Sequence, residues 1–143
     1  MFIDTNVFVL ARFATAPGHA AARSSLEAAF NGTDPLRISR QVIREYLAVV
    51  TREQSWQRPI ATADALEDVA RLGSACDILE DGPKVMDALA DLCREVPVAG
   101  RQIHDANIVA TMVAHGERHL LTFNRKDFLR YRARIDLVSA KAA

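Results

Sequence analysis

The chain has 143 residues, half of them hydrophobic, and its 18 acidic and 18 basic residues cancel at neutral pH. This length and hydrophobicity suit a single folded domain over residues 1–143 and argue against a disordered chain. The N-terminus lacks the basic start and apolar run of a signal peptide, and no stretch reaches about 18 consecutive apolar residues. We therefore expect no membrane span and a cytoplasmic protein.

Short apolar runs alternate with longer amphipathic segments along the chain. Strands are predicted at residues 2–4, 36–39, 76–79, 119–123 and 135–139. Helices are predicted from a cap at Asn6 to about Phe13 and over 19–30, 40–52, 62–74, 83–95 and 103–115, with a helical turn within 124–131. This alternation indicates an α/β fold in which a central, mostly parallel twisted sheet is covered on both faces. Ligands of such sheets bind beyond the carboxyl ends of the strands.

Four acidic residues stand at or near those predicted strand ends. Asp4 ends the first strand, and Asp127 follows the fourth strand. Asp105 lies in the first turn of the sixth helix, on its apolar stripe, and Glu45 borders the apolar face of the third helix. Each acid taken alone also fits a turn, a helix cap or a solvated side chain. Taken together, the four can converge at one edge of the predicted sheet.

Converging carboxylates repel one another, and a hard cation would relieve that repulsion. Oxygen ligands favour Mg²⁺ or Mn²⁺, and a metal held by carboxylates activates water for attack on a phosphodiester. A zinc site is not favoured, because His115 and His119 are separated by Gly116, where we expect the helix to end. The sequence contains neither a G-x-S-x-G motif nor a P-loop.

The basic residues are mostly arginine, which supplies 15 of the 18. Residues 97–143 carry eight basic and four acidic residues, whereas residues 62–95 carry three basic and nine acidic ones. Basic side chains that flank the acidic motifs could follow a nucleic-acid backbone or could be ordinary solvated charges. They are Arg12, Arg40, Arg44, Arg101, Arg125, Lys126, Arg130, Arg132 and Arg134.

Four motifs, in this order, resemble the PIN-domain ribonucleases, and most closely the VapC-type toxins of type II toxin–antitoxin systems. They are "FIDTN" at the start, "ISRQVIREYLAV" in the middle, "HDANIVATMVAHG" later and "LLTFNRKDF" near the end. The resemblance covers nearly the whole chain and implies a three-layer α/β/α PIN-like fold. It also implies an endoribonuclease dependent on Mg²⁺ or Mn²⁺ that acts on a structured RNA such as tRNA or rRNA. An antitoxin protein whose tail crosses the active-site groove, and a homodimer, are the implied partners.

The resemblance also assigns residues to the site. Asp4, Glu45 and Asp105 match the metal-binding acids of the family. Both Asn124 and Asp127 fall in the segment that supplies the fourth catalytic position, and we favour Asp127. Polar neighbours are expected to order the site or to meet the substrate. These are Thr5, Asn6, Thr122, Asn124 and Arg125.

Other functions fit part of this pattern. A PIN-fold nuclease could process RNA without a toxin role, and an adjacent antitoxin gene would separate the two functions. A phosphatase-like domain with Asp4 as nucleophile is disfavoured, because such enzymes place a second acid two residues later, where this chain has Asn6. A catalytically silent binding module would cleave no RNA in the presence of Mg²⁺.

Overall fold

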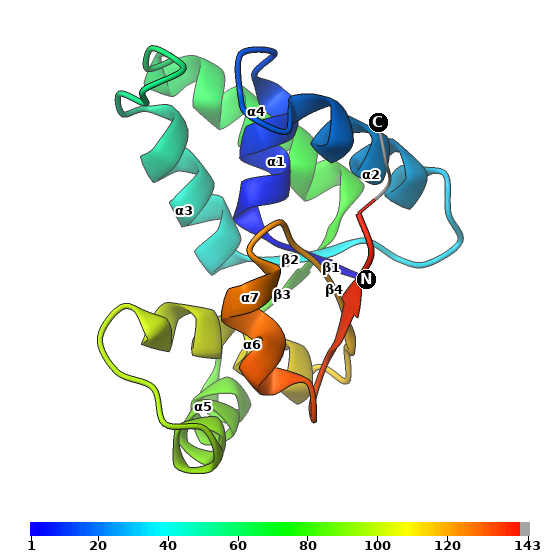
Figure 1. Ribbon diagram of the computed structural model, residues 1–143, viewed down its shortest axis with the longest axis vertical. Coiled ribbons are helices and arrows are strands. Elements are labelled where there is room, and N and C mark those ends of the chain that lie inside the picture. Colours follow the sequence, from blue (N-terminus) through cyan, green and yellow to red (C-terminus); the bar gives the residue numbers. More distant parts are fainter. Residues whose placement is uncertain (141–143) are drawn as a thin grey trace.

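The computed structural model describes residues 1–140, and these form a parallel sheet between two layers of helices (Figure 1). The strands are β1 (Phe2–Ile3), β2 (Arg37–Ser39), β3 (Asp77–Leu79), β4 (His119–Leu121) and β5 (Asp136–Val138). The helices are α1 (Thr5–Arg12), α2 (His19–Phe30), α3 (Arg40–Val50), α4 (Thr62–Ala75), α5 (Pro83–Glu95), α6 (Gln102–Ala114) and α7 (Arg125–Phe128). A 3₁₀ turn, η1 (Leu129–Tyr131), follows α7.

The sheet has the strand order β3-β2-β1-β4-β5, and every neighbouring pair is parallel. Helices α1 to α4 cover one face of the sheet, and α5 and α6 cover the other (Figure 1). The predicted three-layer α/β/α fold is therefore confirmed. The central strand is β1, whose Phe2 and Ile3 are fully buried, as a strand covered on both faces requires.

Every predicted helix and strand is present, and the ends differ from the prediction by at most two residues. The prediction that Asn6 caps the first helix was wrong. Asp4 is the cap, and its Oδ1 accepts a hydrogen bond from the backbone N–H of Thr5 at 2.8 Å. The reason is that β1 ends at Ile3, one residue earlier than the apolar pattern suggested, so Asp4 stands at the start of the helix. Within residues 1–140, no helix is long and apolar enough to cross a membrane.

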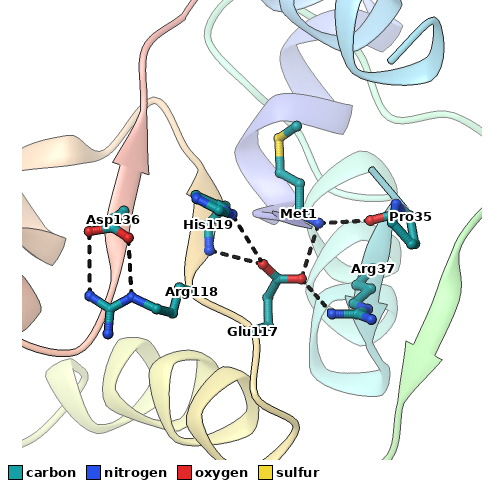
Figure 2. A network of polar contacts seen from close by, with 7 residues as sticks. All are labelled: Met1, Pro35, Arg37, Glu117, Arg118, His119 and Asp136. Carbon is teal, nitrogen blue, oxygen red and sulfur yellow. Dashed lines mark hydrogen bonds and ion pairs between the residues drawn. The ribbon is translucent and has the colours of Figure 1, made fainter. Parts of the chain in front are cut away.

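At the amino ends of the three middle strands, a buried carboxylate ties the strands together (Figure 2). Glu117 is only 5% exposed. Its Oε2 accepts from Arg37 Nη1 at 2.7 Å and from the Met1 amino group at 3.1 Å, and its Oε1 accepts from the His119 backbone N–H at 2.9 Å. Burial alone would raise the pKa of Glu117, but the charged and backbone donors have the larger combined effect. The pKa of Glu117 is therefore below its ordinary value of 4.5. One side chain therefore fixes the starts of β1, β2 and β4.

We expect Glu117→Gln to lower the free energy of unfolding near neutral pH by about 2–3 kcal/mol, because it leaves the Arg37 guanidinium without its carboxylate. Since folding lowers the pKa of Glu117, its contribution is present above the unfolded value and is lost as the pH falls through the folded value. Urea unfolding near neutral pH and again well below pH 4.5 tests this, and the difference between variant and parent should shrink in acid.

A matched control lies in the same region of the molecule (Figure 2). Asp136 pairs with Arg118 at 3.2 Å, but both side chains are 55% exposed. Because solvent screens such a pair, Asp136→Asn should leave the urea midpoint almost unchanged. Equal losses of stability in the two variants would contradict the role assigned to Glu117.

Candidate functional site

The four predicted acids line one cavity of about 890 Å³ at the carboxyl edge of the sheet. Asp4 stands at the junction of β1 and α1, and Glu45 lies on α3. Asp105 is in the first turn of α6, and Asp127 is in α7, just after β4. The fold thus brings acids from four distant segments of the chain to a single hollow, as the sequence predicted.

The Asp4 carboxylate is nearly buried, and three donors hold it in place. Its Oδ1 accepts from the Thr5 backbone N–H at 2.8 Å. Its Oδ2 accepts from Asn6 Nδ2 at 3.0 Å and from Thr122 Oγ1 at 2.7 Å. Asn6 also donates to Thr122 at 3.3 Å, which links the two neighbours of the carboxylate. With both oxygens engaged, Asp4 has a single well-defined orientation at the floor of the cavity.

The pairing of the strands explains why Thr122 reaches Asp4 across 118 residues of sequence. Ile3 of β1 pairs with Leu121 of β4, and the Asp4 N–H donates to the Leu121 carbonyl at 3.0 Å. Asp4 and Thr122 are therefore the first residues beyond the same pair of strand ends. Parallel register, rather than any local sequence signal, places the hydroxyl against the carboxylate.

Burial and mutual repulsion both raise the pKa of two of these acids. Burial raises the pKa of Asp4 to about 6, and the negative charges of Glu45 and Asp105 add to this effect. Partial burial also raises the pKa of Asp105, helped by the charges of Asp127 and Glu45. Within residues 1–140, none of the four carboxylates has an ion-pair partner within 4.0 Å. Among these described residues, the four carboxylates therefore face the cavity without an ion pair to neutralise them.

Glu45 is held by two side chains at the cavity wall. Thr5 Oγ1 donates to its Oε2 at 2.9 Å, and Gln41 Nε2 donates to its Oε1 at 2.8 Å. The Thr5 backbone N–H, by contrast, donates to Asp4, so Thr5 contacts two of the four acids. The side chains of the two residues after Asp4 thus contact different acids. The Asn6 amide donates to Asp4, and the Thr5 hydroxyl donates to Glu45.

The segment after β4 contributes both candidates for the fourth position. Asn124 and Asp127 each line the cavity, and Asp127 acts electrostatically on Asp105. The backbone N–H of Asn124 donates to Thr122 Oγ1 at 3.0 Å, which ties this turn to the hydroxyl beside Asp4. Arg125 does not line the cavity, because its guanidinium donates to the Val138 carbonyl at 2.8 Å on β5. Its predicted role in ordering the site or meeting the substrate stays a prediction.

Three arginines, Arg44, Arg52 and Arg101, also line the cavity, and Arg52 was not among the predicted ones. Other predicted arginines are paired elsewhere: Arg12 Nε lies 3.0 Å from Asp68, and Arg40 lies 2.6 Å from Glu80. The remaining walls are partly apolar. They include Val9, Leu10, Ala48, Val49 and Phe123.

Gln41 and Asn107 belong to the same polar network, and sequence reasoning missed both. Asn107 Nδ2 donates to Gln41 Oε1 at 2.9 Å, and Gln41 in turn reaches Glu45. Helical spacing offered a signal, because Gln41 precedes Glu45 by four residues and so shares its helix face. Asn107 gave no such signal.

The donor set fits a hard divalent cation in its chemistry and charge. All four acids offer oxygen ligands, and their repulsion would fall if a cation bound between them. Within the described residues, no three histidine, cysteine, aspartate or glutamate side chains already stand together as a ready ligand set. This still suits Mg²⁺, which commonly binds through one or two carboxylates and keeps several waters.

The fold and the cavity together define a class: a parallel α/β domain whose acids gather beyond the carboxyl end of its central strand. The family model described as "PIN domain" matches residues 1–134, and this chain belongs to that family. The family predicted from the sequence is therefore confirmed.

Several solved structures share this fold. A toxin–antitoxin complex from Klebsiella pneumoniae is 21% identical, with a TM-score of 0.67, and the match covers 96% of this chain and 95% of that one. VapBC2 from Rickettsia felis, bound to a promoter DNA fragment, is 17% identical, with a TM-score of 0.67 and 96% of both chains covered. VapC20 from Mycobacterium tuberculosis, a sarcin-ricin-loop-cleaving toxin, is 14% identical, with a TM-score of 0.69 and 94% and 95% covered. No curated protein sequence matches this chain.

Proposed function

We propose that this chain is a metal-dependent endoribonuclease and the toxin of a type II toxin–antitoxin pair, acting as one PIN domain over residues 1–143. The observation that carries the proposal is the gathering of Asp4, Glu45, Asp105 and Asp127 around one cavity beside three arginines. The toxin role is supported by the shared fold of toxin–antitoxin complexes over almost the whole chain.

In this proposal, Asp4, Glu45 and Asp105 hold Mg²⁺ or Mn²⁺, and Asp127 is the fourth catalytic acid. The bound cation would supply an activated water and would neutralise charge on the phosphodiester. The chain's own residues prepare the site. Asn6 and Thr122 fix the Asp4 carboxylate, so this side chain would lose little conformational freedom when a cation binds.

Substrate binding is assigned to the basic part of the cavity wall. Arg44, Arg52 and Arg101 present guanidinium groups beside the acids, and these suit the phosphates on either side of the cleaved bond. Contacts between these arginines and the RNA phosphates do not depend on which bases the RNA carries. We therefore propose that a structured RNA, such as a tRNA or rRNA, is selected through its shape.

The partner proposed for the cavity is an antitoxin segment. The cavity combines an acidic floor with apolar walls that include Val9, Val49 and Phe123. A peptide with apolar side chains and one basic residue would match both features, and it would block RNA from the acids. We propose a homodimer as the assembly of the toxin itself.

The test is to induce the chain in bacterial cells and to map newly formed RNA ends, with Asp4→Ala as the control. The parent should create new ends at one or a few sites in a structured RNA and should arrest growth, and the control should do neither. Co-expression of a small protein encoded next to the gene should restore growth. If the same RNA ends formed with Asp4→Ala, the proposed site would be refuted.

A further inference from the structure

We infer that Gln41 is a positioning residue that holds Glu45 of α3 and the first turn of α6 in fixed relation, and that Asn107 locks Gln41 in place. The inference rests on the proposed function, since it concerns the same acidic site. It adds two residues to that site that the family resemblance does not assign.

Both N–H groups and the oxygen of the Gln41 amide are hydrogen-bonded, although the side chain stands at a cavity wall. It is only 8% exposed. Its Nε2 donates to Glu45 Oε1 at 2.8 Å and to the His104 carbonyl at 2.8 Å, which uses both N–H groups. Its Oε1 accepts from Asn107 Nδ2 at 2.9 Å.

These partners allow only one orientation of the amide. If the amide were flipped, its oxygen would face the Glu45 carboxylate and the His104 carbonyl, and both contacts would be repulsive. Its nitrogen would then face the Asn107 amide nitrogen, which is also a donor. Gln41 is thus pinned from three sides, and the position of the Glu45 carboxylate follows from it.

The contacts of Gln41 join the two helical layers, which are not adjacent in sequence where these contacts form. Gln41 and Glu45 lie on α3, on one face of the sheet, whereas His104 and Asn107 lie on α6, on the other (Figure 1). Asn107 Nδ2 also lies 3.3 Å from Asp81 Oδ2, just beyond β3. The network therefore spans both helical layers at the carboxyl edge, between two of the proposed cation-binding acids.

His104 directly precedes Asp105, so the bond from Gln41 to the His104 carbonyl sets the start of α6 relative to Glu45. Without the Gln41 amide, Glu45 would keep only the Thr5 hydroxyl, and its other oxygen would be free to turn. A carboxylate that must be ordered upon binding costs affinity, and loss of such supporting contacts typically weakens a metal site about 10–100-fold.

The test compares Gln41→Met with Gln54→Met, using free Mn²⁺ measured by electron paramagnetic resonance. Methionine keeps the length of the side chain and removes the amide. Gln54 is near the C-terminal end of α3, and its Nε2 donates only to the Val49 carbonyl, at 3.2 Å. We expect Gln41→Met to bind Mn²⁺ about 10-fold more weakly than the parent and Gln54→Met to bind it normally.

Asn107→Ala should weaken Mn²⁺ binding less than Gln41→Met does, and it should have no further effect in the double variant, because Asn107 acts through Gln41. A second readout needs no metal. In EDTA, the side-chain amide protons of Gln41 should exchange with solvent about 10-fold more slowly than those of the exposed Gln102, and Asn107→Ala should remove that protection.

The outcomes separate this inference from the proposed function. Unchanged Mn²⁺ affinity in Gln41→Met, or fast exchange of its amide protons in the parent, would overturn the positioning role even if the parent cleaved RNA. A parent that bound Mn²⁺ in a Gln41-dependent way but cleaved no RNA would support the positioning role and refute the nuclease. A parent that bound no Mn²⁺ would overturn both.

Discussion

Asp4→Asn and Asp105→Asn are each expected to reduce RNA cleavage by the purified protein at least about 1,000-fold, equivalent to about 4 kcal/mol of transition-state stabilisation. Asparagine has nearly the shape of aspartate but supplies one neutral oxygen in place of a charged pair. Asp4 lies at the junction of β1 and α1, Asp105 lies on α6, and the charge of Asp105 acts on Asp4. Removing either charge should therefore disable the site as a whole.

The measurement is initial cleavage rate on a radiolabelled structured RNA with Mg²⁺, alongside circular dichroism of each variant. Asp91→Asn is the control, because that aspartate is an exposed acid on α5 paired with Arg94 at 3.0 Å, outside the cavity. The control should cleave at the parent rate, and all three variants should have the parent's helical spectrum. Cleavage by Asp4→Asn within 10-fold of the parent would contradict the assignment.

The sequence was sufficient to predict the elements that carry these acids. Alternating apolar strands and helices predicted the parallel three-layer fold, and strand ends predicted where Asp4 and Asp127 would stand. Asp4, Asp105 and Asp127 lie within a few residues of a strand or helix end, where local pattern fixes position. Glu45, by contrast, lies in the middle of α3 and was proposed from its helix face and the family resemblance.

What the sequence did not predict depends on contacts between distant elements. Arg12 was expected either to follow a nucleic-acid backbone or to be an ordinary solvated charge, but α4 brings Asp68 within 3.0 Å of it. Arg125 lies within a site motif, but its guanidinium turns to the Val138 carbonyl on β5. The direction of a long side chain depends on partners that only the packed fold supplies. Closeness to the acids along the chain therefore does not predict whether an arginine points toward them.

The same limit applied to Gln41 and Asn107. Neither residue type is characteristic of a metal site, and the two side chains are hydrogen-bonded to each other only because α3 and α6 meet at one edge of the sheet. The four candidate acids were proposed from the sequence and its family resemblance, whereas the amides next to Glu45 became apparent only from the hydrogen bonds.

The second large effect concerns stability and follows from the raised pKa of Asp4. The free energy of unfolding should respond to pH in opposite ways in the metal-free and the metal-loaded protein. Folding raises the pKa of Asp4 from 3.8 to about 6. A raised folded pKa means that the contribution of Asp4 to stability is fully present below the unfolded value and is lost as the pH rises through the folded value. For this buried group, the loss is about 3 kcal/mol in the absence of metal.

Mg²⁺ should reverse this loss at high pH, because it binds the ionised carboxylates and competes with protons. At a concentration of about 100 times its dissociation constant, the cation adds about 2.7 kcal/mol to the free energy of unfolding. Below the folded pKa of Asp4, protons hold the site, and the same concentration should add much less. Urea unfolding in EDTA and in Mg²⁺, near pH 3.8 and again above about pH 6, measures both effects.

Asp4→Asn isolates the contribution of this one carboxylate, because other groups also titrate in the range, and Glu117 does so with the opposite sign. Subtracting the variant from the parent should leave a stability difference that declines as the pH rises through about 6 in EDTA. The variant should also lose most of its stabilisation by Mg²⁺. Equal stabilisation of the parent by Mg²⁺ above and below that pH would mean that the cation binds away from Asp4, and the acidic cavity would then have to act without it.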